Sequence, residues 1–136
     1  MRRVTAPRLH GWPIGRHHYI VTVSDAFEAH STALSYGGGR DGVSNLTSLL
    51  GSLGRPYHDY HRPIHKKAAA LLHGVATSHG FVDANKRTAW LLTDLLVERS
   101  GNSLELQEDD AIDDLVVNVV TGDMSESQLA QWIRAG

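Results

Sequence analysis

The feature that most constrains the fold is a helix-length segment that is apolar on almost every side. Between Asn85 and Gly101 the apolar residues are Ala89, Trp90, Leu91, Leu92, Leu95, Leu96 and Val97. At 3.6 residues per turn these positions cover most of a helix circumference, so the helix has to be surrounded by other elements. The segment therefore predicts a central helix, and the rest of the chain must cover it.

The remaining apolar residues recur at spacings of three and four, which favours amphipathic helices over strands. Five further helices are expected, beginning after Thr22, after Ser44 or Asn45, near Pro63, near Ile112 and after Ser125. The glycines at 37–39, 54 and 122 are typical helix ends. No convincing strand pair is visible. The predicted architecture is all-α, a compact helical bundle around the buried central helix.

Length and composition limit the classes of protein that remain. The chain has 136 residues, enough for one domain, and we expect residues 1–18 to form a poorly ordered arm before a domain over 19–136. It has no cysteine, which excludes thiol catalysis and disulfide scaffolds. Thirteen Lys and Arg against fifteen Asp and Glu give a net charge of -2, which argues against direct nucleic-acid binding. No membrane span or secretion signal is visible, so a cytoplasmic protein without a membrane partner is expected.

The segment with the most chemistry lies between the third helix and the central helix. It reads His79-Gly80-Phe81-Val82-Asp83-Ala84-Asn85-Lys86-Arg87. Two cations in the first turn of a helix oppose the positive end of its dipole, which favours an anion there. Phosphate is the natural candidate, since a guanidinium and backbone amides suit its oxygens. This reasoning predicts an anion site that could serve phosphoryl or nucleotidyl transfer.

Two side chains of the segment have chemical roles in such a site. Asp83 is a hard oxygen ligand, and Mg²⁺ is commonly held by one or two carboxylates together with substrate phosphates. His79 can take the proton from an attacking hydroxyl. It continues the apolar stripe of the third helix, so we expect it at the helix end, pointing inward.

Each residue also has a purely structural interpretation. His79 alone is typical of a helix-terminal histidine that meets a backbone carbonyl. Asp83 or Asn85 alone is typical of a helix N-cap. Lys86 and Arg87 alone are typical of solvated surface cations. Only the joint placement of all five on one loop favours a functional site.

The same segment resembles the Fic/Doc family, whose motif reads H-x-F-x-[DE]-[GA]-N-[GK]-R. The run Ala84-Asn85-Lys86-Arg87-Thr88-Ala89 resembles the Doc (death-on-curing) branch in particular. The resemblance implies a compact all-α fold over residues 19–136 that uses ATP and Mg²⁺ to modify a hydroxyl of a target protein. Most Fic enzymes transfer AMP. Doc-type toxins transfer the terminal phosphate, and their known target is a threonine of elongation factor Tu.

Carried over by position, the resemblance implies a role for each residue of the motif. His79 is the catalytic base, Asp83 the metal ligand, Asn85 with the adjacent backbone the anion hole, and Arg87 the phosphate clamp. The phosphate-binding residues are thus Ala84, Asn85, Lys86 and Arg87. The family's target-aligning flap is expected between the prolines at 56 and 63, at Tyr57, His58, Asp59, Tyr60 and His61.

Two positions favour kinase chemistry within the family. Lys86 stands where adenylylating members have a flexible glycine, and a long side chain there restricts close approach of a phosphate to the backbone. Trp90 stands where those members have a second arginine. A toxin kinase acting on a translation factor is therefore the first hypothesis. An adenylyltransferase and a catalytically silent binding module are the alternatives.

Two other patterns carry less weight. His58, His61 and His65 are spaced for a metal site, but Pro63 interrupts the helix that would bring them together. Ser24 and Glu28 fit part of the family's self-inhibitory helix, although Ala29 follows in place of Gly or Asn. We therefore expect any restraint to come from a separate antitoxin, which would bind an exposed apolar groove.

Overall fold

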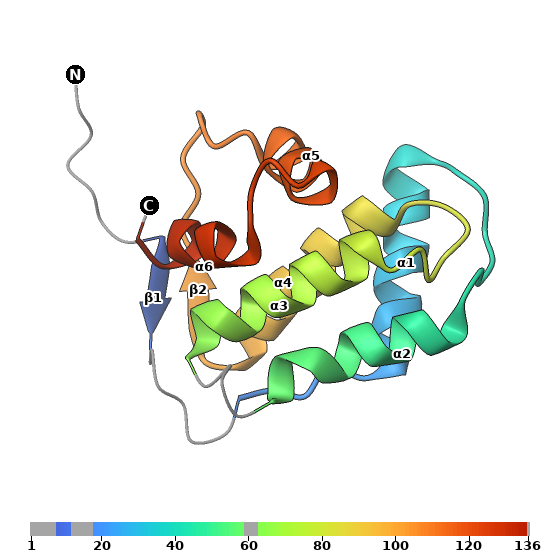
Figure 1. Cartoon of the computed structure of the whole chain (residues 1–136), viewed down its shortest axis with the longest axis horizontal. Coiled ribbons are helices and arrows are strands. Elements are labelled where there is room, and N and C mark those ends of the chain that lie inside the picture. The colour runs from blue at the N-terminus through green and yellow to red at the C-terminus, as the bar shows by residue number, and fades with distance from the viewer. Residues whose placement is uncertain (1–7, 12–17, 59–62, 136) are drawn as a thin grey trace.

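The structure is a computed structural model that describes residues 8–11, 18–58 and 63–135. This part of the chain is a bundle of six α-helices with one short two-stranded sheet (Figure 1). In chain order the elements are β1 (Leu9–Gly11), α1 (Val23–Gly37), α2 (Leu46–Gly54), a 3₁₀ turn (Arg55–Tyr57), α3 (Ile64–Thr77), α4 (Asn85–Arg99), β2 (Asn102–Leu104), α5 (Ile112–Thr121) and α6 (Glu126–Ala135). The all-α prediction is confirmed.

Local capping explains where several helices begin. Before α1, the Asp25 N–H donates to Thr22 Oγ1 at 3.1 Å and the Thr22 N–H donates to Asp25 Oδ2 at 2.9 Å. Asn45 caps α2 by accepting the Ser48 N–H at 3.0 Å. Ser125 and Gln128 exchange the same reciprocal pair before α6. These side chains satisfy backbone donors that a helix leaves unpaired at its start.

The centre of the bundle is shared by two helices. α3 packs against α2, α4, α5 and α6, whereas α4 packs against α1, α3, α5 and β2. Five consecutive residues of α3, from Ala68 to Leu72, are fully buried. On α4 the buried positions are Thr88, Ala89, Leu92, Thr93, Leu96 and Val97, and Trp90, Leu91 and Leu95 are only partly covered. The prediction of a buried fourth helix is thus correct, but α3 is more deeply enclosed, because its small alanines let neighbouring helices approach closely.

The sheet was not expected from the sequence. β1 pairs antiparallel with β2, with Leu9 opposite Leu104. Arg8 is buried beside it, donating to the Trp132 carbonyl at 2.9 Å and to Asp110 Oδ1 at 3.0 Å, and its guanidinium lies over the Trp132 ring. These contacts join residues 8–11 to β2 and α6. The rest of the segment expected to be a poorly ordered arm, residues 1–7 and 12–17, lies outside the described residues.

Some large apolar side chains of the amphipathic helices lie at the surface. Leu46 and Leu50 of α2 are each 47 % exposed, and Phe27 of α1 is 44 % exposed. On α2 the buried side chains are Leu49, Ser52 and Leu53, so the face that meets α3 is narrower than the leucine pattern suggests. The longest helices of the described region, α1 and α4, have 15 residues each, and none of its helices is long and apolar enough to cross a membrane.

Candidate active site

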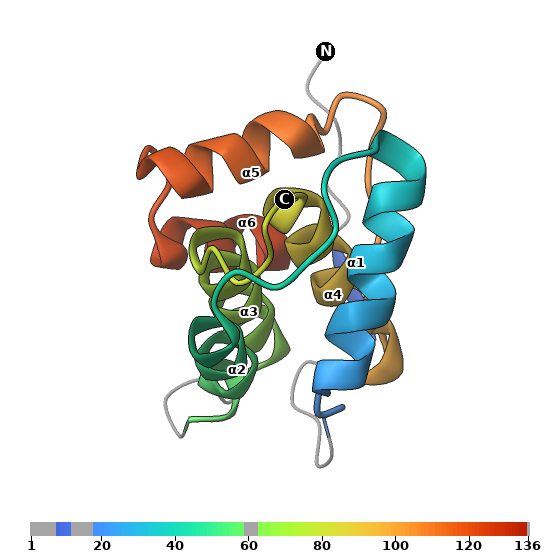
Figure 2. The ribbon, with the colours of Figure 1, turned by 90° about the vertical axis from the view of Figure 1, so that its right-hand side faces the viewer.

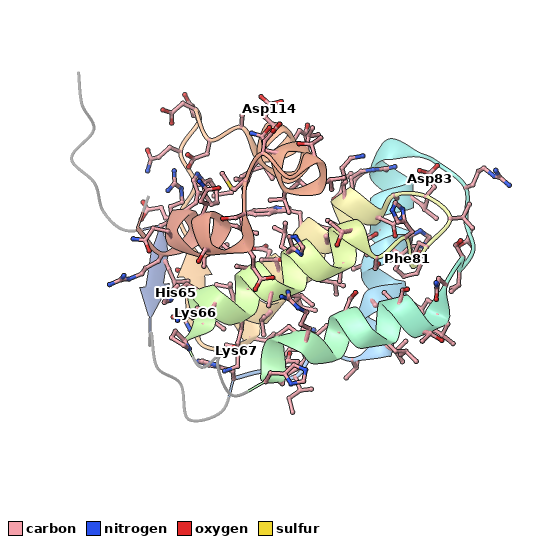
Figure 3. All side chains as sticks on the ribbon, viewed as in Figure 1. His65, Lys66, Lys67, Phe81, Asp83 and Asp114 are labelled. Carbon is pink, nitrogen blue, oxygen red and sulfur yellow. The ribbon has the colours of Figure 1, made fainter. Side chains whose placement is uncertain are left out.

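The predicted chemical segment forms a tight loop between α3 and α4, which we call the motif loop (residues 79–84). It lies at one end of the bundle: Figure 3 shows Phe81 and Asp83 there, with His65, Lys66 and Lys67 at the opposite end. His79 and Ala84, at the two ends of the loop, have left-handed backbone, with φ of 51° and 62°. For a non-glycine residue this conformation costs about 1–2 kcal/mol, so surrounding contacts must hold the loop in shape.

Phe81 and Asn85 close the loop from inside. The Phe81 side chain is buried, 2 % exposed, and its ring stacks on His30 at a centroid distance of 3.9 Å and an interplanar angle of 5°. The Asn85 side-chain amide bonds both polar groups of the Phe81 backbone: Oδ1 accepts its N–H at 3.0 Å, and Nδ2 donates to its carbonyl at 2.9 Å. Asn85 therefore shapes the loop from within.

Asp83 presents an ionised carboxylate at the surface of the loop. Its Oδ1 accepts the Ala84 N–H at 2.9 Å, and its Oδ2 accepts the Arg40 N–H at 3.2 Å. These two backbone hydrogen bonds, with the nearby charges of Arg87 and Arg40, lower the pKa of Asp83 below its usual value. The side chain is exposed, so an incoming cation can reach it.

The start of α4 has no side-chain cap. The N-cap residue is Ala84, which has no polar side chain, and the first backbone bond of the helix runs from the Thr88 N–H to the Ala84 carbonyl. Backbone N–H groups at this end therefore keep the positive end of the helix dipole available to an anion. The first turn carries no acidic residue. Lys86 is exposed on it, whereas Arg87 is partly covered.

The connection between α1 and α2 is bound along the motif loop, and we call residues 38–45 the pairing segment. The N–H groups of Ser44 and Asn45 both donate to the Gly80 carbonyl, at 2.8 and 3.0 Å. Val43 and Phe81 form an antiparallel bridge, and the Val82 N–H donates to the Gly42 carbonyl at 3.0 Å. Figure 2 faces this end and shows the connection running beside the α3–α4 loop. The site is therefore built from two chain segments about forty residues apart.

Arg87, in the first turn of α4, ties that helix to the end of α1 and the start of the pairing segment. Its guanidinium donates to the Ala33 carbonyl at 2.5 Å and to the Gly38 carbonyl at 2.8 Å. A Cβ on Gly37 would lie 2.1 Å from Arg87 Nη1, and one on Gly39 would lie 2.8 Å from Asp83 Oδ2. Gly39 also has φ of +121°. These glycines thus give Arg87 and Asp83 room against the end of α1.

A pocket of about 380 Å³ opens next to the cationic turn of α4. It lies between α1, α4 and α5, and its walls are mostly apolar. Its lining includes Ala33, Tyr36, Trp90, Val116 and Val117, with Lys86 and Arg87 at one side. Tyr36 is 84 % exposed and Val117 is 44 % exposed, so an apolar surface leads into the pocket from solvent.

Comparison with known proteins identifies the family. Residues 21–97, more than half of the chain, match the family model described as the Fic/DOC family. The chain belongs to the Fic/DOC family. It is also 40 % identical over 65 residues to a protein named Toxin Doc from Mycolicibacterium smegmatis (strain ATCC 700084 / mc(2)155). That alignment covers 47 % of this chain and 50 % of the relative, so it spans about half the length of Toxin Doc.

The Fic/DOC match contains α1 to α4 up to Val97, and thus the motif loop and the pairing segment. The sequence resemblance to the Fic/DOC family, in its Doc branch, is confirmed by these two findings. β1, β2, α5 and α6 lie beyond the matched residues.

The structure brings the predicted motif residues together but changes the expected arrangement of three. His79 is exposed and does not point inward, because α3 ends at Thr77, Ser78 caps it, and the positive φ of His79 turns the chain outward. The Asn85 side-chain amide donates to the Phe81 carbonyl, and the Arg87 guanidinium donates to the Ala33 and Gly38 carbonyls. These donors are therefore already engaged within the protein. The backbone at the start of α4 and Lys86 are therefore the groups most directly presented to an anion.

The described part of the predicted flap, Tyr57 and His58, does not lie beside the motif loop. The Tyr57 hydroxyl donates to the Tyr19 carbonyl and accepts the Val21 N–H, both at 2.8 Å, just before α1 begins. The motif loop packs against Phe27 and His30 of α1, and its Asp83 lies near Gly39, beyond the end of that helix. Tyr57 and His58 follow α2, whose nine residues, about 14 Å, lead away from the pairing segment and the motif loop. Asp59, Tyr60 and His61 lie outside the described residues. The segment beside the loop is residues 38–45.

The histidine metal site finds no support in the part of the chain that the structure describes. No group of three or more His, Cys, Asp or Glu side chains is placed there to hold a metal ion, and His61 is not among the described residues. Burial, together with the charges of Arg134 and Lys66, lowers the pKa of His65. His65 is therefore a histidine that favours its neutral form.

Sequence reasoning gave no role to His30. It lies on the buried face of α1 with Ala26 and Ala33 and is only 3 % exposed. Its Nε2 is 3.0 Å from the Asp83 carbonyl oxygen. A histidine at helical spacing within an alanine-lined face was the available signal, because a buried imidazole needs a polar partner.

Proposed function

We propose that this protein is a Doc-like toxin kinase, which transfers the γ-phosphate of ATP to a serine or threonine hydroxyl of a translation factor such as elongation factor Tu. The observation that carries the proposal is the motif loop, where an exposed imidazole, an ionised carboxylate and an uncapped helix start lie within one turn of chain. The name of the relative, Toxin Doc, supports the toxin assignment.

The residues fit a magnesium–nucleotide complex. Asp83 is ionised and exposed, and a single carboxylate with phosphate oxygens is a common way to hold Mg²⁺. When bound, Mg²⁺ neutralises phosphate charge as it moves toward the leaving oxygen. The N–H groups at the start of α4 and the exposed Lys86 ammonium would contact the same phosphates, orienting the γ-phosphate and stabilising its charge.

The remaining chemistry is one proton transfer and one displacement. His79 accepts the proton of the target hydroxyl, whose oxygen then bonds to the γ-phosphorus. The bond between the γ-phosphorus and the β–γ bridging oxygen breaks, and ADP leaves. The exposure of His79 suits this role, because the hydroxyl belongs to a separate protein that must approach from solvent. The pairing segment lies beside the loop, so it is the surface that the target backbone would meet.

The adenylyltransferase alternative uses the same site with the nucleotide reversed. Lys86 in place of a glycine and Trp90 in place of the second arginine favour the kinase. The deciding experiment is the intact mass of purified elongation factor Tu after incubation with the protein and Mg·ATP. We expect a gain of one phosphate. A gain of AMP would overturn the kinase assignment, and an unchanged mass across a panel of translation factors would favour the binding module.

We further propose that a separate antitoxin restrains the toxin by covering the apolar pocket between α1, α4 and α5. The pocket supports this because it is apolar, partly exposed and adjacent to Lys86 and Arg87. The test is growth arrest in a bacterial host. Val117→Asp should still arrest growth, yet a co-expressed antitoxin that rescues cells from the parent protein should fail to rescue them from this variant. Equal rescue of both would place the antitoxin elsewhere.

A further inference from the structure

We infer that His30 is a positioning residue that holds the Asp83–Ala84 peptide group and thereby aims the Asp83 carboxylate. It touches neither substrate nor metal. It acts through the backbone of the motif loop, from the buried face of α1. The part of this inference that concerns the metal rests on the proposed function, whereas the part that concerns the loop does not.

The direction of the hydrogen bond assigns the donor. A carbonyl oxygen can only accept, so the 3.0 Å contact between His30 Nε2 and the Asp83 carbonyl requires a hydrogen on Nε2. His30 Nδ1 lies 3.8 Å from Asp41 Oδ1 in the pairing segment. The ring itself stacks on Phe81. One buried imidazole thus contacts the middle of the motif loop, its far end and the pairing segment.

The peptide group between Asp83 and Ala84 is fixed at both of its polar ends. His30 holds the carbonyl oxygen, and the Asp83 carboxylate accepts the N–H of Ala84. A peptide unit is planar, so fixing the carbonyl also fixes where the N–H points. The same plane holds Ala84 at φ of 62°, which is strained for alanine. Without the His30 donor, rotation of this peptide would relieve the strain and withdraw the N–H from the carboxylate.

The carboxylate has a second backbone partner that depends on the same geometry. Asp83 Oδ2 accepts the Arg40 N–H, which ties the carboxylate to the pairing segment. If the peptide rotates, the Ala84 N–H loses its acceptor, and the carboxylate keeps only the Arg40 N–H, which alone does not fix its orientation. Groups behind a metal ligand commonly change metal affinity by about 10–100-fold when they are removed. His30 is therefore expected to control how well Asp83 is presented to a cation.

The test compares His30→Leu with His30→Gln. The two side chains are similar in size and both lose the aromatic stack on Phe81, but only glutamine can offer an N–H to the Asp83 carbonyl. Phe27→Leu is the matched control, because it changes the edge contact of Phe27 with Phe81, at 6.0 Å between ring centroids, and leaves Asp83 alone. All three variants are made in the full chain, and thermal unfolding establishes that each is folded.

The first readout is amide hydrogen exchange, which needs no ligand. In His30→Leu, the Ala84 and Arg40 amides should exchange faster than in the parent protein, while amides within α4 remain protected. His30→Gln should restore slow exchange at both positions, and Phe27→Leu should leave them unchanged. Equal exchange rates in the leucine and glutamine variants would overturn the inference.

The second readout is Mn²⁺ affinity, measured by electron paramagnetic resonance with a non-hydrolysable ATP analogue present. His30→Leu should weaken Mn²⁺ binding about tenfold, with recovery in His30→Gln. A loss of affinity that follows the loss of stability across all three variants would mean that His30 is only structural. If the parent protein binds no Mn²⁺, the proposed function fails, and the exchange comparison still decides the role of His30.

Discussion

Two helices of equal length begin in opposite ways, and the contrast shows where this protein leaves groups for a ligand. α1 and α4 both have 15 residues. α1 begins with a complete capping box from Thr22 and Asp25 and has a carboxylate in its first turn. α4 begins at Ala84 without a side-chain cap, and Lys86 and Arg87 occupy its first turn. At the start of α1, side chains of the protein bond the backbone donors. At the start of α4 the backbone donors and the two cations favour a negatively charged ligand.

The contrast also separates stability from function. Side chains at the start of α1 compensate backbone donors, so their removal should cost unfolding free energy and leave chemistry alone. The start of α4 keeps a strained residue and uncompensated charge next to Asp83, so its changes should affect activity far more than folding. Strain of this kind persists where surrounding contacts enforce it, which is common at functional sites.

The largest effect should come from His79→Ala. His79 is exposed and lies after the end of α3, so the variant should unfold at nearly the same temperature as the parent protein. Loss of a general base typically lowers a rate about 10²–10⁴-fold. Initial rates of phosphate incorporation into elongation factor Tu measure the change. Full activity in the variant would remove the imidazole from the mechanism.

Asp83→Asn should come next, with a loss of Mg-dependent nucleotide affinity of about tenfold or more, the scale of one charge-assisted contact. Isothermal titration of Mg·ATP, with a metal-free titration as control, measures it.

The low pKa of Asp83 means that its ionised form stabilises the fold. That contribution is present above the unfolded pKa of about 3.9 and disappears as the pH falls through the lower folded value. The stability gap between parent and variant should therefore be larger at pH 6 than at pH 3.

The sequence predicted some of these features and not others. Helix starts were predictable where one local side chain decides them, as Thr22, Asn45 and Ser125 do. The chemistry of the motif was predictable because its residues are contiguous. The direction of the His79 side chain was not predictable in the same way. The prediction continued the apolar stripe of α3 to His79, but the helix ends before it, at Thr77 with Ser78 as its C-cap.

Contacts between distant segments carried no sequence signal. The prolines at 56 and 63 mark a loop but do not say where it lies, so the sequence could not place Tyr57 at the start of α1, where its hydroxyl bonds Tyr19 and Val21. Gly39 and Arg40 lie next to Asp83, although more than forty residues separate them in the sequence, and no periodic pattern indicates this contact. β1 and β2 are three residues each, too short for the alternation that identifies a strand.

A moderate effect on stability alone should follow from Thr22→Ala. It removes the side chain that accepts the Asp25 N–H at the start of α1. Loss of such a cap costs about 0.5–2 kcal/mol of unfolding free energy. Urea unfolding measures the change, and Ser24→Ala, an exposed position in the same turn, is the control. An equal effect in both variants, or a comparable fall in transfer rate per folded molecule, would contradict the separation of the two helix starts.

The smallest effect should come from Ala84→Gly, and here the sign is informative. Glycine relieves the left-handed strain of about 1–2 kcal/mol but adds about 0.4–1 kcal/mol of unfolded-state entropy, so stability should stay equal or rise slightly. The same change at Ala29, inside α1, should cost about 0.5–1 kcal/mol. Urea unfolding of the pair distinguishes them. If Ala84→Gly destabilises as much as Ala29→Gly, Ala84 is not strained, and the start of α4 is held no differently from an ordinary helix interior.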